Sequence, residues 1–287
     1  MKHVVMFSGG IGSWATAKRV AEQHGTDEMV LVFADVKGDN PSPHIGEDED
    51  TYRFIEDAAK NIGAELVVVK DGRDIWQVFK DDDRFLGNSR LANCSKFLKQ
   101  RPSRKWLEEN CSPEDTVVYV GIDWTETKRL PAIESAYLPY VAKAPLCEAP
   151  FLDKQDMISW AESEGLEPPR LYGKGFPHNN CGGGCVRAGQ GQFKLLLEKD
   201  PERYAVWERK EQELRDYLGK DVAILRDRSK AKVAEYNRRN PGEKPSTAVP
   251  LTLKAFREMV DYQPALIELD ELGGCGCFVD DDLTGNH

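Results

Sequence analysis

The stretch Ser8-Gly9-Gly10-Ile11-Gly12-Ser13 carries residue types that bind phosphate groups. It lies between an apolar run, residues 3–7, and a segment with helical spacing, residues 13–24. Glycines let the backbone approach a ligand, and the first N–H groups of a helix attract anions. The serines add hydroxyl donors. An ordinary tight turn needs fewer special residues, so we predict that this turn binds phosphate, although it matches neither Walker A nor GxGxxG.

Three cysteines have positions that suit a metal centre. Cys181 and Cys185 are separated by three glycines, and Cys94 precedes a basic segment. Thiolates suit zinc and iron–sulfur clusters. Three thiolates on a [4Fe–4S] cluster would leave one iron open to sulfide or to a substrate sulfur, whereas structural zinc usually takes four ligands. The alternative is buried, inert thiols, which we expect for the isolated Cys111 and Cys147.

Cys275 and Cys277 lie in an acidic, glycine-rich tail. We consider four roles for them: nucleophile, persulfide carrier, fourth cluster ligand or inert end. A reactive thiolate needs positive neighbours, and the tail offers only acids. Lys99 and Arg129 are the cations that we expect to serve in the reaction, by binding phosphate or sulfate oxygens; the alternative for each is an ordinary surface charge. The other cations and a histidine that we place near the site are Lys96, Arg101, Arg187 and His178.

The elements that position these residues alternate between strand and helix. Strands are predicted at residues 3–7, 29–35, 65–70 and 116–123, with a fifth inside 144–151, and helices at 13–24, 49–62 and 154–165. Continuous Val-rich runs separated by helices indicate a parallel sheet covered on both faces. We therefore predict an α/β fold with a doubly wound, mostly parallel five-stranded sheet, which binds ligands at the carboxyl ends of its strands.

The second part of the sequence has a different character. Residues 168–193 are rich in Pro, Gly and Asn and predict a loop; helices are expected at 191–199 and 201–218, and another loop at 237–252. We predict a nucleotide-binding α/β domain over residues 1–167, followed by a region of cysteine loop, helices and flexible tail over 168–287.

Several of these motifs resemble the PP-loop of the adenine nucleotide alpha-hydrolase superfamily. The family signature SGGxDS is matched by Ser8, Gly9, Gly10 and Ser13, with Gly12 in place of the Asp. Segments similar to phosphoadenylyl-sulfate (PAPS) reductases follow in the same order: residues 32–69, NCSKFLKQRPSRKWL at 93–107, GIDWTETKRL at 121–130 and PFLDKQ…CGGGC at 150–185. The likeness covers about residues 3–195.

The resemblance implies a HUP-type fold that binds ATP or an adenylyl nucleotide. The implied ligands of the nucleotide are the turn together with Asp35 and Gly121, and Mg²⁺ would screen the phosphates. Adenylyl-sulfate reductases and the DNA phosphorothioation sulfurtransferase carry a cluster on cysteines in the regions of Cys94, Cys181 and Cys185. Gly12 weakens the expectation of ATP pyrophosphatase activity, because the missing Asp is typical of enzymes that cleave ATP.

Composition and charge indicate where the protein acts and which partners it can bind. The 287 residues carry a net charge of −10, which disfavours non-specific coating of nucleic acid, although the basic stretches 96–105 and 226–239 could contact a phosphate backbone. No transmembrane run and no signal peptide are recognisable, so we expect a cytoplasmic protein without membrane partners. We also expect a homo-oligomer. Free thiols rather than disulfides fit that compartment.

Three functions remain open at this stage. The first is a PP-loop sulfurtransferase with an iron–sulfur cluster, which takes sulfur from a donor and acts on a nucleic acid or nucleotide. The second is a PAPS or adenylyl-sulfate reductase in which Cys275 or Cys277 attacks sulfur and a thioredoxin-like partner resolves the product. The third is a non-catalytic nucleotide-binding module.

Overall fold

A computed structural model describes residues 1–83, 93–242 and 244–262. Its contacts divide the chain into two compact units. The first contains Met1–Ile75 and Cys94–Gly182, and the second contains the described parts of Trp76–Asn93 and Gly183–Cys275. The boundary at residue 167 stays a prediction from composition.

The first unit is an α/β fold around one parallel sheet. Its strands are β1 (Lys2–Met6), β2 (Met29–Asp35), β3 (Glu65–Lys70), β4 (Thr116–Val120) and β5 (Val141–Lys143). The sheet order is β3-β2-β1-β4-β5, and every neighbouring pair is parallel. The predicted doubly wound, five-stranded sheet is therefore confirmed.

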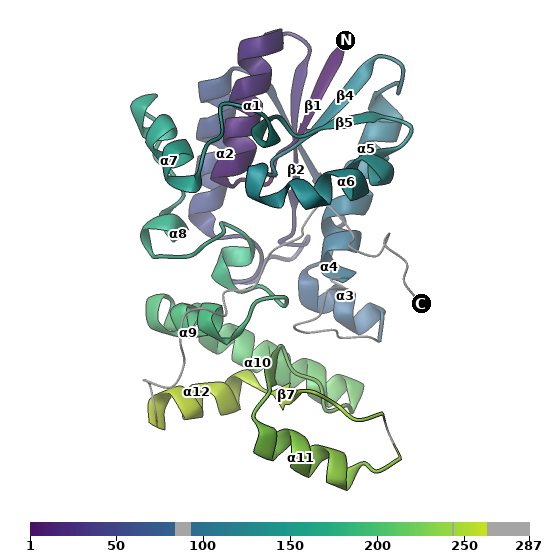
Figure 1. Cartoon of the computed structure of the whole chain (residues 1–287), viewed down its shortest axis with the longest axis vertical. Helices are drawn as coiled ribbons and strands as arrows, with labels where there is room; N and C mark the ends of the chain where they lie inside the picture. Colours follow the sequence, from purple (N-terminus) through teal and green to yellow (C-terminus); the bar gives the residue numbers. More distant parts are fainter. Residues whose placement is uncertain (84–92, 243, 263–287) are drawn as a thin grey trace. The chain divides into compact units, whose positions relative to one another are not determined.

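Helices cover both faces of this sheet (Figure 1). Alternate strand residues such as Val5 and Leu31 pack on one face against α1 (Ile11–His24), α2 (Glu49–Ile62) and α7 (Lys154–Ser163). Their neighbours, such as Val4 and Val30, pack on the other face against α5 (Arg101–Asn110) and α6 (Leu130–Tyr137). Because both faces are buried, these strands are apolar at successive positions. The short elements that lie wholly in this unit are the π-helical η1 (Lys96–Gln100), η2 (Trp124–Arg129), η3 (Pro145–Cys147) and α8 (Arg170–Gly173). Two more, α4 (Asn93–Ser95) and η4 (Cys181–Gly183), cross its boundaries.

The second unit is mainly helical. It contains α9 (Gln190–Lys199), α10 (Pro201–Leu218), α11 (Lys230–Arg239), α12 (Leu253–Tyr262), most of α3 (Ile75–Asp81) and the antiparallel pair β6 (Leu225–Asp227) and β7 (Val249–Leu251). Aromatic rings form part of its core: Trp207 lies 5.4 Å from Trp76 and 6.0 Å from Phe193, measured between ring centroids.

Two predictions about secondary structure are wrong. The fifth strand lies at Val141–Lys143, before the predicted segment 144–151, where Pro145 and Pro150 lack the N–H groups that a strand would use. Residues 237–252 are not one loop, since they include the end of α11 and all of β7. The short strand β7 contains Pro250 and owes its form to pairing with β6, which its local sequence does not indicate.

Candidate functional site

The turn Ser8–Ser13 lies where an open parallel sheet usually binds its ligand. β1 is hydrogen-bonded to β2 on one side and to β4 on the other, so the strand order reverses between β1 and β4. Crevices at the carboxyl ends of strands at such a switch point are the usual ligand sites of doubly wound sheets. The fold thus brings the turn to the predicted edge, between β1 and the N-terminus of α1.

Gly9 gives the turn its shape. Its φ is +76°, and a Cβ there would lie 2.8 Å from Cγ2 of Thr51 and 2.9 Å from Cδ1 of Ile55. Both the conformation and the close approach to α2 therefore require glycine. Among the described residues, no group accepts a hydrogen bond from the N–H of Gly9 or of Gly12.

The two serine hydroxyls stabilise the turn from within. Ser13 Oγ donates to the carbonyl of Gly10 at 2.7 Å, and Ser8 Oγ donates to Ser13 Oγ at 3.3 Å while accepting from the N–H of Gly10 at 3.4 Å. Ser13 is only 3% exposed. Its hydroxyl thus fixes the backbone that would hold a ligand.

Gly12 and Gly121 pack the start of α1 closely against the end of β4. A Cβ at Gly121 would lie 2.9 Å from the backbone of Ser13, and one at Gly12 would lie 3.3 Å from the carbonyl oxygen of Gly121. Gly12, which stands at the Asp position of the PP-loop signature, therefore has a packing role in this chain. Both predicted residues belong to the same edge of the sheet as the turn.

Two residues at this turn were missed by the sequence analysis. The hydroxyl of Tyr172 accepts the N–H of Ile11 at 3.1 Å, and Nδ2 of Asn179 donates to the carbonyl of Gly9 at 2.8 Å. Asn179 is 2% exposed, and its Oδ1 has no hydrogen-bond partner among the described residues. Both lie in the Pro- and Gly-rich segment 168–193, in which no local spacing indicates them.

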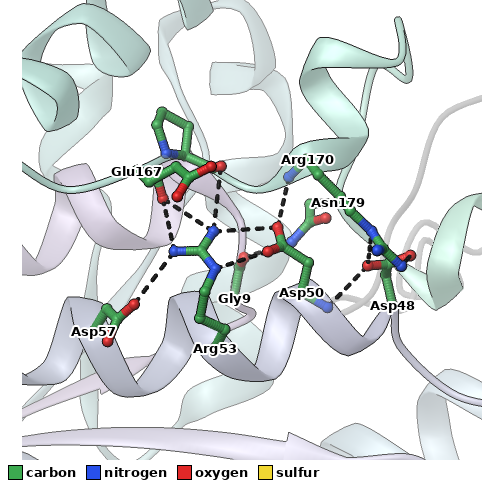
Figure 2. A network of polar contacts seen from close by, with 9 residues as sticks. Gly9, Asp48, Asp50, Arg53, Asp57, Glu167, Arg170 and Asn179 are labelled. Carbon is green, nitrogen blue, oxygen red and sulfur yellow. Dashed lines mark hydrogen bonds and ion pairs between the residues drawn. The ribbon is translucent and has the colours of Figure 1, made fainter.

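A charged network holds the start of that segment, up to Arg170, on α2 (Figure 2). Arg170 pairs with Asp48 at 2.7 and 2.9 Å, and its backbone N–H donates to Asp50 at 2.7 Å. Arg53 donates to Asp50 at 2.7 Å and to the carbonyl of Glu167 at 3.3 Å. Burial raises the pKa of Asp50, but the hydrogen bonds from Arg53 and Arg170 outweigh it and hold that pKa below its ordinary value. The network fixes the start of α8, which carries Tyr172.

Asp35 lies at the end of β2, as predicted. Its Oδ1 accepts from the hydroxyl of Tyr52 at 2.7 Å and from the N–H of Lys37 at 3.1 Å. Burial raises the pKa of Tyr52, and the carboxylates of Glu47 and Asp35 raise it further, so its hydroxyl remains a donor. The ammonium of Lys37 lies 3.3 Å from the centroid of the Tyr52 ring. Asp35 is therefore held in place beside the edge of the sheet.

Lys99 forms a buried ion pair with Glu47. Its Nζ lies 2.9 Å from Oε1 of Glu47, and the two residues are 5% and 2% exposed. Burial lowers the pKa of Lys99, yet the charge of Glu47, with smaller effects of Cys181 and Cys94, raises it above the ordinary value. The other oxygen of Glu47 accepts the backbone N–H of Cys181. The pair thus anchors η1 and the beginning of the cysteine loop to one carboxylate.

The predicted cluster ligands are divided between the two units. Cys94 and Cys181 belong to the first unit, and Cys185 belongs to the second. The described residues contain no group of three or more His, Cys, Asp or Glu side chains that could hold a metal ion. We derive no chemical step through a [4Fe–4S] cluster.

The glycines of the cysteine loop have conformational roles of their own. Cys181, Gly182 and Gly183 all have positive φ, at 51°, 59° and 86°. A Cβ at Gly184 would lie 2.8 Å from the Trp207 ring. The predicted cysteine loop thus contains a tight turn whose glycines are required by backbone geometry and packing.

Two cations lie close enough to His178 to affect its pKa. His178 has its pKa lowered to about 4, first by burial and then by the charges of Lys154 and Arg129. Arg129 pairs with Glu126 on η2. Lys154 donates to the carbonyl of Pro177, and its ammonium lies 6.0 Å from the centroid of the Tyr172 ring. His178 is therefore neutral at pH 7, and the positive charge here comes from Lys154 and Arg129.

Of the remaining thiols, those of Cys111 and Cys147 lie in the described part of the chain. Burial raises the pKa of both Cys111 and Cys147, which keeps these thiols in their less reactive protonated form. Sγ of Cys147 also donates to the carbonyl of Asp123 at 3.3 Å. Cys275 and Cys277 lie outside the described residues. Arg187 belongs to the second unit.

A cavity of about 570 Å³ lies in the first unit beside α1, but it is not lined by any of the predicted site residues. Its lining residues are Arg19, Glu22, Gln23, Pro145, Glu148, Ala149, Pro150, Leu152 and Trp160. In the described part of the chain, no helix combines the length and the apolar character needed to cross a membrane. Comparison with known proteins gives no matching family model and no matching curated protein.

Proposed function

We propose that this protein is a PP-loop enzyme that binds ATP or an adenylyl nucleotide through the turn Ser8–Ser13 and uses it in sulfur transfer. One observation supports nucleotide binding above the others. The turn lies at the switch point of a parallel sheet, and the N–H groups of Gly9 and Gly12 have no partner among the described residues. Backbone N–H groups at the start of a helix are the donors that phosphate oxygens use.

The charges near the turn favour an anion despite the acidity of the chain. Lys154 and Arg129 lie close enough to His178 to lower its pKa, and Lys154 is near Tyr172, which contacts the turn. Mg²⁺ would add charge to screen the phosphates of ATP. Asp35, fixed at the end of β2, is a candidate for a contact with the ribose or base.

The sulfur chemistry rests on the family resemblance. The proposal includes a nucleotide or nucleic acid as the sulfur acceptor and a separate sulfur donor. It also includes a cytoplasmic location and a homo-oligomeric state. The reductase alternative depends on Cys275 and Cys277, outside the described residues, so no structural observation favours it.

Calorimetry with ATP, AMP, adenosine and adenylyl sulfate tests the nucleotide site. The informative variant is Gly10→Asp. Gly10 is the N-cap of α1 with φ −96° and ψ 161°, a position and conformation that Asp adopts readily, so the helix should form. The new Cβ would lie 3.2 Å from the hydroxyl of Tyr172, which must shift slightly. The carboxylate would repel a phosphate, and we expect ATP binding to be lost. Ser229→Asp, the same added charge at the N-cap of α11, is the matched control and should bind ATP normally.

Failure of the wild-type protein to bind any of these ligands would overturn the nucleotide site. Pyrophosphate release from ATP distinguishes the enzyme from a module that only binds. Anaerobic purification with iron and sulfide analysis of the wild type and of Cys94→Ala, Cys181→Ala and Cys185→Ala tests the cluster separately. Wild-type protein without iron would rule out the cluster that the sequence predicts and would leave the nucleotide site intact.

A further inference from the structure

The hydroxyl of Tyr172 accepts a hydrogen bond but donates none to a described residue. Its oxygen accepts the N–H of Ile11 at 3.1 Å, at the first residue of α1. A tyrosine hydroxyl also has one proton to donate, and no described residue accepts it. The hydroxyl lies 3.2 Å from the point that a Cβ of Gly10 would occupy. A free donor thus lies directly against the turn.

A second observation at the turn also indicates a missing ligand. Asn179 is 2% exposed, and its amide group faces the turn because Nδ2 donates to the carbonyl of Gly9. Its Oδ1 is buried without a partner among the described residues. Buried polar atoms in native proteins are nearly always hydrogen-bonded. The ribose hydroxyls of a nucleotide are donors that could satisfy this oxygen.

The surroundings of Tyr172 keep its hydroxyl protonated and in place. Burial raises the pKa of Tyr172 to about 12, so the proton is present at neutral pH. The Arg170–Asp48 pair fixes the helix turn that carries it. The ammonium of Lys154 lies 6.0 Å from the centroid of the Tyr172 ring. One of its three N–H groups donates to the carbonyl of Pro177.

We propose that Tyr172 and Lys154 are phosphate-binding residues: the Tyr172 hydroxyl accepts from Ile11 and donates to a phosphoryl oxygen of a nucleotide held by the turn, and the Lys154 ammonium pairs with the same phosphate. This inference rests on the proposed nucleotide site and names side chains that complete it. Tyr172 extends the row of backbone donors by one hydroxyl, and Lys154 supplies the charge that the turn itself lacks.

The test is calorimetry with ATP and with adenosine on Tyr172→Phe, which removes only the hydroxyl. We expect the Kd for ATP to rise about 10- to 100-fold, as for a lost hydrogen bond to a charged group, with the Kd for adenosine unchanged. Tyr140→Phe is the matched control, because the Tyr140 side chain is buried and its hydroxyl donates, among the described residues, to the carbonyls of Leu107 and Cys111 alone. It should bind ATP as the wild type does.

Equal or tighter ATP binding by Tyr172→Phe would overturn the proposal; tighter binding would mean that the hydroxyl competes with the phosphate for Ile11. Lys154→Met, a change at an exposed residue, provides a second variant should the first not fold. It should weaken ATP binding about tenfold or more and spare adenosine, and unchanged ATP binding would exclude Lys154. If the wild type binds no adenine nucleotide, the proposed function fails as well, whereas a failure of the two variants alone leaves it standing.

Discussion

Replacing Lys99 with Met should destabilise the first unit strongly. The side chains of Lys99 and Glu47 are 6% and 0% exposed, and their charged atoms lie 2.9 Å apart. Lys99→Met leaves the Glu47 carboxylate buried without its cation, and removal of one partner of a buried pair costs about 3–5 kcal/mol. The N–H of Cys181 still donates to Glu47, which partly compensates, so we expect a loss near 3 kcal/mol, roughly the lower end of that range.

The double variant Glu47→Gln/Lys99→Met separates the pair from simple packing. The introduced glutamine side chain would be neutral and would retain an oxygen to accept from Cys181, so the double variant should recover much of the lost stability. The control is Lys105→Met at the exposed pair Lys105–Glu109, with atoms 3.9 Å apart and side chains 76% and 60% exposed. Exposed pairs of this kind contribute less than about 1 kcal/mol.

Amide hydrogen exchange in β1 and β2 is the suitable assay, since it reports on the opening of the first unit by itself. The free energy of opening should fall for Lys99→Met, recover in the double variant and hardly change for Lys105→Met. Equal losses for Lys99→Met and Lys105→Met would show that water reaches the Lys99–Glu47 pair and would refute this reasoning.

Three further predictions concern stability. Gly9→Ala should cost at least about 1–2 kcal/mol because of its positive φ, with more from the contact with Thr51, and should lower the midpoint of urea unfolding. His178 has a pKa lowered from 6.5 to about 4, so its protonation favours the unfolded chain. The contribution of neutral His178 to the free energy of unfolding is complete above pH 6.5, and about 2–3 kcal/mol of it is lost as the pH falls toward 4. His178→Asn should remove this part of the pH dependence of unfolding. Identical plots of unfolding free energy against pH for the variant and the wild type would contradict the assignment. Glu211 is 2% exposed and accepts from the N–H groups of Ile224 at 2.7 Å and Leu253 at 2.6 Å. Glu211→Gln leaves one of these donors unpaired and should destabilise the second unit by about 1–3 kcal/mol, measured by exchange of the two amides.

Local sequence determined much of the first unit. The ranges 29–35, 49–62 and 65–70 were predicted with the bounds that the structure gives, because apolar runs and helical periodicity are properties of neighbouring residues. The turn Ser8–Ser13 was found in the same way, since its glycines and serines are contiguous.

Only the tertiary structure determined what surrounds the turn. Tyr172 is 161 residues from Ile11, Asn179 is 170 from Gly9, and Lys99 is 52 from Glu47. These contacts form because a parallel sheet gathers the carboxyl ends of distant strands and their following segments at one edge. No periodicity or spacing within a segment encodes such a pairing, so the sequence did not indicate that Lys99 pairs with Glu47 and gave no sign of Tyr172.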